Sequence, residues 1–311
     1  MKAAQINGYG HAGVVRVIET EKPTASEEQV LVKVEAASLN PFDTSLREGY
    51  MQKMIPLQFP ATLGGDIVGT VTAVGAGVSQ FAAGDKVFGQ ANVVAGNSGA
   101  FAEFAATAAG QVAKAPAKLK ATEAAATPLV GVSALQALTE HIKLTAGQKL
   151  LIHGGGGSIG AVAVQLAKQL GARVAATATG SDIEYVKSLG ADEVIDYKSQ
   201  DFTKLVSDYD AVFDTVGGAV FEQSFAVLRP GGIAVTMIAQ FDEAKAQEHG
   251  IAALMQGTKV TTAALDKLRQ FIEDGTMNVR VDSSFPLNQI QQAFEKRESG
   301  SAHGKIVIAM L

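Results

Sequence analysis

The stretch LLIHGGGGSIG carries glycines at Gly155, Gly157 and Gly160, a G-x-G-x-x-G spacing. It follows an apolar segment and opens an amphipathic one, which is the context that a dinucleotide-binding corner requires. A pyrophosphate must come close to the backbone at a helix N-terminus, where unpaired N–H groups favour negative charge and a Cβ would obstruct it. The pattern predicts a dinucleotide site that includes Ser158 and Ile159. The alternative, a flexible glycine hinge, fits the regular apolar flanks poorly.

The end of the next strand bears on which coenzyme is bound. An acid there binds the adenosine 2′-hydroxyl of NAD and repels the 2′-phosphate of NADP, and here Ala178 stands at that place. The nearby hydroxyl groups that can donate to phosphate oxygens are those of Thr177, Thr179 and Ser181. This favours NADPH. Asp182 is the opposing feature, because no Lys or Arg precedes Lys187 in that loop.

The pattern of residues changes near Ala121, and each part predicts a different set of elements to position these residues. Up to about Ala121, short β-branched runs bounded by turn residues predict an antiparallel β unit. Beyond it, apolar strands alternate with amphipathic helices, which predicts a parallel sheet with helices on both faces. The strands expected there are 149–153, 173–178, 193–197, 209–214, 232–238 and 250–255.

A length of 311 residues suggests two domains. The change of residue pattern near Ala121 suggests where the boundary between them falls. We expect one domain at 1–121 with 258–311 and the other at 122–257. The apolar run 305–309 predicts a last strand that returns to the first domain.

Composition narrows the class of protein. Hydrophobic residues make up 47% and charged residues 18% of the chain, which is typical of globular domains. The absence of cysteine excludes disulfides and thiolate zinc sites, and the five histidines are too scattered to suggest another metal site. A net charge of −5 with no basic cluster argues against nucleic acid. Without a membrane-length apolar run or a signal-like N-terminus, we expect no membrane contact and a cytoplasmic location.

Several motifs resemble the medium-chain dehydrogenase/reductase superfamily across essentially the whole chain. They are LGGDIVGTV at 63–71, VGAGV at 74–78, GDKVFG at 84–89, DTVGG at 214–218, LRPGG at 228–232 and HGKIV at 303–307. NPFDTSLREG at 40–49 is similar to the signature of the quinone oxidoreductase branch. The resemblance implies an α/β protein with a GroES-like β-rich catalytic domain, a Rossmann doubly wound domain, and a coenzyme cleft between them.

The chain departs from the zinc enzymes of that superfamily. They carry a His-Glu pair where Gly65 and Asp66 stand and a catalytic cysteine near Asn40. The resemblance therefore implies a metal-free site. It also implies coenzyme contacts at Val216, Gly217, Met237, Ile238 and Tyr197, with Tyr197 at the 2′-phosphate. A basic residue often stands where this chain has Asp182.

A hydride passing from NADPH to a quinone or an α,β-unsaturated carbonyl needs alignment and a hydrogen bond at the oxygen, and no metal. Asn40 can orient coenzyme or substrate, Tyr50 can donate a hydrogen bond or proton, and Asp43 can fix the loop. Each residue has a structural alternative. Asn40 can hydrogen-bond the backbone, Tyr50 can be a solvent-exposed loop residue, and Asp43 can form an Asx turn.

Two further functions stay open on sequence alone. One is reduction of enoyl thioesters, which would need a groove for an acyl chain and its carrier. The other is a coenzyme-binding sensor or structural protein without turnover. Whatever the function, the superfamily resemblance also implies a homodimer or homotetramer. Its members are often joined through the sixth strand, which is 250–255 in this chain.

Overall fold

The computed structural model describes residues 1–275 and 277–310, which form two compact units. Unit 1 comprises Met1–Leu129, Val260–Glu273 and Val279–Leu311, and unit 2 comprises Val130–Lys259 and Asp274–Asn278. The chain thus leaves unit 1 later than the change of residue pattern near Ala121, because the helix at Ala121–Ala125 packs on the sheet of unit 1.

Unit 1 is β-rich and contains two sheets. The first is antiparallel, in the order β2-β1-β4, with β1 at Lys2–Ile6, β2 at Arg16–Glu19 and β4 at Ala61–Thr62. The second has the order β15-β16-β3-β5-β6-β8, with β7 also pairing β3. Its strands are β3 Gln29–Leu39, β5 Asp66–Val74, β6 Lys86–Gln90, β7 Phe104–Ala108, β8 Val112–Lys114, β15 Val281–Pro286 and β16 Lys305–Ala309.

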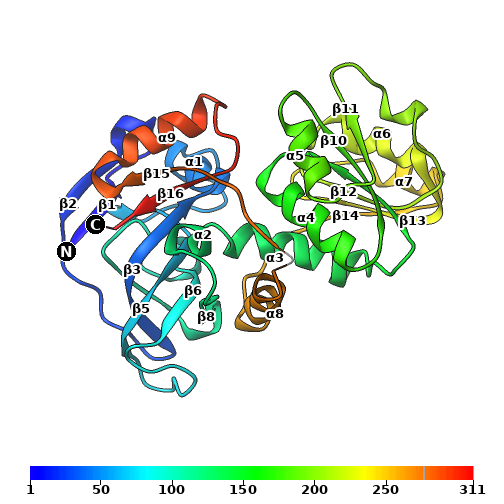
Figure 1. Ribbon diagram of the computed structural model, residues 1–311. Coiled ribbons are helices and arrows are strands. Elements are labelled where there is room, and N and C mark those ends of the chain that lie inside the picture. The colour runs from blue at the N-terminus through cyan, green and yellow to red at the C-terminus, as the bar shows by residue number, and fades with distance from the viewer. Residues whose placement is uncertain (276, 311) are drawn as a thin grey trace. The chain divides into compact units, whose positions relative to one another are not determined.

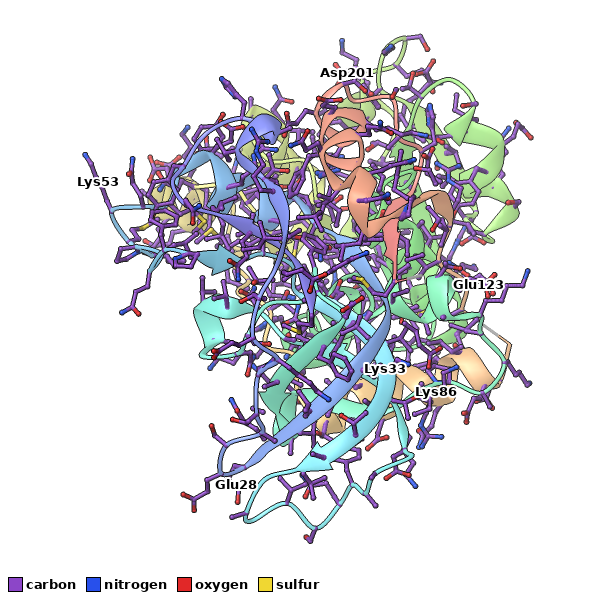
Figure 2. All side chains as sticks on the ribbon, turned by 90° about the vertical axis from the view of Figure 1, so that its left-hand side faces the viewer. Glu28, Lys33, Lys53, Lys86, Glu123 and Asp201 are labelled. Carbon is purple, nitrogen blue, oxygen red and sulfur yellow. The ribbon has the colours of Figure 1, made fainter. Side chains whose placement is uncertain are left out.

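The last strand returns to unit 1, as the sequence predicts. β16 pairs antiparallel with β3, with Ile306 opposite Leu39, and parallel with β15. The helices that accompany these sheets are α1 Pro41–Glu48, α2 Ala121–Ala125, α8 Thr262–Glu273 and α9 Ile290–Glu298. Lys33 on β3 and Lys86 on β6 are exposed, while Val32 and Val87 beside them are buried in the apolar core (Figure 2).

Unit 2 holds a six-stranded sheet in the order β11-β10-β9-β12-β13-β14, and every pairing in it is parallel. The strands are β9 Lys149–His153, β10 Arg173–Ala178, β11 Glu193–Asp196, β12 Tyr209–Asp214, β13 Leu228–Thr236 and β14 Ala252–Met255. The prediction of a parallel sheet is confirmed, and β9, β10 and β12 have the predicted bounds.

Three strands differ from their predicted bounds, and β13 differs at both ends, since it begins at Leu228 and not at residue 232. The other differences have local causes. β11 ends at Asp196, not Tyr197, because the Asp196 carboxylate accepts the Lys198 N–H and turns the chain. β13 ends at Thr236, whose hydroxyl accepts the Ile238 N–H at 3.3 Å and bends the backbone. β14 begins at Ala252 because Gly250 has φ +66°.

Helices flank both faces of this sheet, with α4 and α5 on one side and α6 and α7 on the other (Figure 1). Their bounds are α3 Pro128–Gln136, α4 Ser158–Gln169, α5 Asp182–Ser188, α6 Ala219–Gln223 and α7 Glu243–Glu248. A π-helical turn at Ala137–His141 extends α3. The strand order reverses between β9 and β12, the place where doubly wound sheets bind dinucleotides. In the part of the chain that the structure describes, no helix has the length and apolar character needed to cross a membrane.

Candidate functional site

The glycine-rich segment 154–160, which we call the glycine corner, joins β9 to the first turn of α4 at the carboxyl edge of the sheet in unit 2. The N–H of Gly155 donates to the carbonyl oxygen of Thr177 at 2.9 Å, and the N–H of Gly154 donates to the Thr177 hydroxyl at 3.1 Å. Thr177, expected near the 2′-phosphate, therefore holds the corner against β10. Ser158 and Ile159 form the first turn of α4, directly after the glycines.

The glycines of the corner differ in what a side chain would meet. A Cβ on Gly160 would lie 2.1 Å from the carbonyl oxygen of Gly154, and a Cβ on Gly155 would lie 2.9 Å from the Cβ of Ala176. Both positions need glycine so that unit 2 can pack. A Cβ on Gly157 would have the Gly154 oxygen, at 3.3 Å, as its single neighbour within 4 Å among the described residues. Apart from this oxygen, no described atom lies near that position at the N-terminus of α4, where a helix can bind a pyrophosphate.

The end of β10 carries the residues expected to choose the coenzyme. The Thr179 side chain hydrogen-bonds the carboxylate of Asp196, and Ser181 is exposed. Asp182 is the first residue of α5, and its Oδ2 lies 2.8 Å from where a Cβ on Gly156 would be. A carboxylate thus stands beside the glycine corner. Tyr197, directly after β11, is 57% exposed.

A hydrogen-bond network joins the carboxyl ends of β12 and β13. The carboxylate of Asp214 accepts the N–H groups of Val216 at 3.0 Å and Gly217 at 3.1 Å, and the hydroxyl of Thr236 at 2.7 Å. A Cβ on Gly217 would lie 2.9 Å from Ile238 Cγ1. The structure therefore brings Val216, Gly217 and Ile238 together.

Two neighbours of this network complete the carboxyl edge. Met237 is half-buried, and its N–H donates to the Asp214 carbonyl oxygen. His153, the last residue of β9, lies inside unit 2, where its ring nitrogens contact the hydroxyls of Ser224 at 2.9 Å and Thr177 at 3.3 Å. Burial lowers the pKa of His153 to about 4, so the ring is neutral at physiological pH.

In unit 1, Asn40 lies directly before α1 and is 2% exposed. Its side-chain N–H donates to Asp66 Oδ2 at 2.9 Å, while its amide oxygen accepts from the ammonium of Lys305. Its backbone N–H donates to Asp43 Oδ2 at 2.7 Å, which fixes the start of the helix. Both ends of the Asn40 amide are therefore engaged inside the unit.

A buried cluster of charged groups surrounds this amide. The carboxylate of Asp66 accepts the hydroxyl of Ser38 and the amide of Gln90, and it lies 3.8 Å from the ammonium of Lys305. Burial raises the pKa of Asp66 and lowers the pKa of Lys305, while the attraction between the two opposes both shifts. Burial also raises the pKa of Asp43, to about 7.

Tyr50 differs from Asn40 and Asp43 in being 76% exposed. It follows Gly49, which ends α1 with φ +77° and where a Cβ would collide with the Tyr9 ring at 2.8 Å. Lys53, further along the same loop, points away from the molecule (Figure 2). The Tyr50 hydroxyl is thus open to solvent or a ligand, whereas Asn40 and Asp43 belong to the buried cluster.

Three residues of these networks were missed from the sequence. Lys305 begins an apolar strand. A lysine at a strand end is ordinarily expected to be exposed, so the sequence gives no sign that this one is buried. Asp214 and Thr236 each end a parallel strand, which is the signal that points to this edge of the sheet. Among residues 1–275 and 277–310, no group of three or more histidines and acids is arranged to hold a metal ion.

Comparison with known proteins gives the family. Residues 26–117 match the alcohol dehydrogenase GroES-like domain, and residues 189–308 match the zinc-binding dehydrogenase family. The chain is 35% identical to a chloroplast envelope quinone oxidoreductase homolog of Arabidopsis thaliana, over 99% of this chain and 98% of that one. It is 32% identical to a chloroplastic NADPH-dependent alkenal/one oxidoreductase of the same plant, over 99% of this chain and 79% of the relative.

A solved structure is similar over the full length. The quinone oxidoreductase from Coxiella burnetii superposes with a TM-score of 0.92 at 31% identity, covering 100% of this chain and 99% of that one. The chain belongs to the medium-chain dehydrogenase/reductase superfamily, in its quinone oxidoreductase-like branch. The expected fold class is confirmed, since unit 1 is GroES-like and unit 2 has the Rossmann arrangement.

Proposed function

We propose that this protein is an NADPH-dependent reductase that delivers a hydride to quinones or α,β-unsaturated carbonyls without a metal ion. The observation that carries the proposal is the glycine-rich turn at the N-terminus of α4, which lies at the switch point of a parallel sheet and where a Cβ on Gly157 would meet a single described atom within 4 Å. The names of the quinone and alkenal/one oxidoreductase relatives support the substrate class.

Unit 2 supplies the coenzyme site in this proposal. The first-turn N–H groups of α4 would hold the pyrophosphate beside Gly157, and Val216, Gly217, Met237 and Ile238 would hold the nicotinamide half. Ser181 and Tyr197 are exposed and can reach the 2′-phosphate, which favours NADPH over NADH. Asp182 works against that preference, because its carboxylate repels a nearby phosphate.

The chain's own part in the reaction is to orient the reactants, exclude water and supply a proton or hydrogen bond. Reduced nicotinamide supplies the hydride when bound. Tyr50 donates to the substrate oxygen, on which negative charge develops. Asn40 and Asp43 position the start of α1 and the loop that carries Tyr50. The absence of cysteine supports a site without zinc.

The test is to mix purified protein with NADPH and follow oxidation of the coenzyme with quinones, enones, alkenals and a crotonyl thioester. We expect turnover with quinones or with enones and alkenals. Turnover confined to the thioester would favour the enoyl-thioester reductase, and tight NADPH binding without any turnover would favour a sensor or structural role. Stoichiometric zinc in the native protein would contradict the metal-free site.

We also propose a homodimer or homotetramer joined through β14, in the cytoplasm. β14 is an edge strand, and its Met255 is 59% exposed, so its outer side can pair with a second copy. Light scattering at micromolar protein should give at least twice the monomer mass, and a monomer would contradict the proposal.

A further inference from the structure

Two side-chain amides lie beside Gly65 in unit 1. Gln90 is the last residue of β6, and Asn92 follows two residues later with an extended backbone, φ −65° and ψ 127°. Residues two apart in an extended chain point to the same side, while Ala91 between them is buried in the apolar core. Both amides face Gly65, because a Cβ on this glycine would have their nitrogens as its nearest neighbours, each 3.7 Å away.

Neither backbone conformation nor packing requires glycine at residue 65. Its φ lies outside the left-handed region, and 3.7 Å is an ordinary van der Waals distance for a Cβ. Gly64 beside it is different, because it has φ +96° and a Cβ there would come within 2.8 Å of the Phe101 ring. The fold would thus accept a side chain at residue 65, yet the chain has none beside the two amides.

The amide nitrogen of Asn92 is a donor without an acceptor. Oδ1 of Asn92 accepts the N–H of Val94 at 3.1 Å, and turning the amide over would set two donors against each other, so Nδ2 must face the other way. Among residues 1–275 and 277–310, nothing accepts a hydrogen bond from Nδ2. The side chain is half-buried and this nitrogen is open to solvent, so a ligand can reach it.

Gln90 adds a second donor. Its Nε2 donates one hydrogen to Asp66 Oδ1 at 3.1 Å, and an amide nitrogen carries two hydrogens. Turning this amide over would set its oxygen against the carboxylate, so Nε2 stays toward Asp66 and Gly65. The second hydrogen has no acceptor within the described part of the chain.

The chemistry of these groups indicates the ligand. Both amides are neutral donors, and the charged partner of Gln90 is the carboxylate of Asp66, which disfavours a phosphate or a carboxylate beside it. A neutral carbonyl oxygen suits the pair better, because it only accepts and has two lone pairs. Quinones and enones carry such an oxygen, whereas the coenzyme site of the proposed function lies in unit 2.

We propose that the side-chain amides of Asn92 and Gln90 donate to the carbonyl oxygen of the quinone or enone beside Gly65. The inference rests on the proposed function. Hydride brings two electrons to the conjugated substrate, so an electron pair moves onto this oxygen while the coenzyme is oxidised, and one proton from solvent or Tyr50 completes the product. The two N–H groups are in place before this charge develops, so they lower the barrier.

The first test removes a donor and leaves the fold. Asn92→Asp keeps the oxygen that accepts the Val94 N–H and loses the NH2 group, so we expect kcat/KM for 1,4-naphthoquinone and for 2-cyclohexen-1-one to fall at least about tenfold. NADPH affinity should stay unchanged. Asn7→Asp is the matched control, because it makes the same change at an exposed amide of unit 1, and it should keep wild-type kinetics.

The second test fills the place of the oxygen and leaves both donors. The Cβ of Gly65→Ala meets the two amide nitrogens at ordinary distances, so the melting temperature should stay close to that of wild type while kcat/KM for both substrates falls at least about tenfold. Gly13→Ala is the control, at a glycine where a Cβ would have no described atom within 4 Å. It should change neither quantity.

The outcomes separate this inference from the proposed function. Turnover by wild type together with unchanged kcat/KM in Asn92→Asp and Gly65→Ala would refute the role of the two amides and leave the reductase intact. A fall in kcat/KM that comes with equally weakened NADPH binding would point to a disturbed fold and would also refute that role. Wild-type protein that binds NADPH but reduces no quinone or enone would instead overturn the proposed function, and this inference with it.

Discussion

The ammonium of Lys305 lies 3.8 Å from Asp66 Oδ2, and both side chains are buried in unit 1. The pair joins the first residue of β16 to the first residue of β5, and the Asn40 amide lies between them with a bond to each. Asp66 stands where zinc enzymes of the superfamily carry a glutamate. In this chain, the position serves a buried ion pair.

Removing one partner of this pair should destabilise unit 1 strongly. Lys305→Met or Asp66→Asn alone leaves the other group buried without its counter-charge, and we expect each to lower the free energy of unfolding by about 3 to 5 kcal/mol. The double variant should lose less than the sum of the two. Urea unfolding of the four proteins measures the coupling, and simple additivity would argue against a functioning pair.

Protonation of Asp43 should make stability depend on pH. Burial raises its pKa from 3.8 to about 7, so between these values the folded protein holds a proton that the unfolded chain releases. The stabilisation is present below pH 3.8 and is lost as the pH rises to about 7, by a few kcal/mol at most. Asp66, Lys305 and Arg297 are the charged groups that act on Asp43 and its neighbours.

The measurement is the unfolding free energy of wild type and Asp43→Asn across this range of pH. Asparagine can still accept the Asn40 N–H but does not titrate. We expect the difference in stability between the two proteins to shift in favour of the variant as the pH rises. Parallel profiles for the two proteins would show that Asp43 does not titrate in this window.

Two glycines of the corner should respond differently to alanine. Gly160→Ala places a Cβ 2.1 Å from a backbone oxygen and should lower both the melting temperature and NADPH affinity. Gly157 has φ −73°, which alanine adopts, so Gly157→Ala should leave the fold nearly intact and weaken NADPH at least about tenfold. Undiminished affinity in Gly157→Ala would mean that the pyrophosphate lies elsewhere.

Asp182 should limit the preference for NADPH. Replacing it with Asn removes a negative charge beside the glycine corner, and we expect NADPH to bind about three- to tenfold more tightly, with a smaller gain for NADH. The gain should shrink at high salt. Glu184→Gln, an exposed acid on the same helix, is the control and should change neither affinity.

Tyr50 and Tyr197 should affect different steps. Tyr50→Phe should lower kcat at least about tenfold and leave NADPH affinity unchanged, because the hydroxyl acts on substrate. Tyr197→Phe should weaken NADPH and leave kcat at saturating coenzyme unchanged. Steady-state kinetics with a quinone, together with coenzyme titrations, separate the two. Full activity in Tyr50→Phe would show that Tyr50 is a solvent-exposed loop residue with no part in the reaction.

Local pattern was enough to predict the sheet of unit 2. The apolar run at 149–153 is followed at once by glycine, and the alternation with helices recurs along the unit, so the sequence predicts the strands and their parallel direction. Their order in the sheet comes from the structure. Strand ends were harder to predict, because they depend on side chains such as those of Asp196 and Thr236, which accept backbone N–H groups two residues further on.

The buried cluster of unit 1 could not be predicted, because its members are distant in the chain. Asn40 reads as a free amide in a signature motif, yet its partners Asp66 and Lys305 lie 26 and 265 residues away. Asn92 carries no motif at all. Its amide comes beside Gly65 only when β6 pairs with β5.

The pairing of β16 between β15 and β3 has a consequence for synthesis of the protein. The ribosome makes β3 long before residues 305–309, so the side of β3 that β16 will cover stays without its partner strand, and Asp66 stays without its cation, while all of unit 2 emerges. Unit 2 can therefore fold while the nascent unit 1 still has an open sheet edge. We expect the chain to be most exposed to aggregation during this interval.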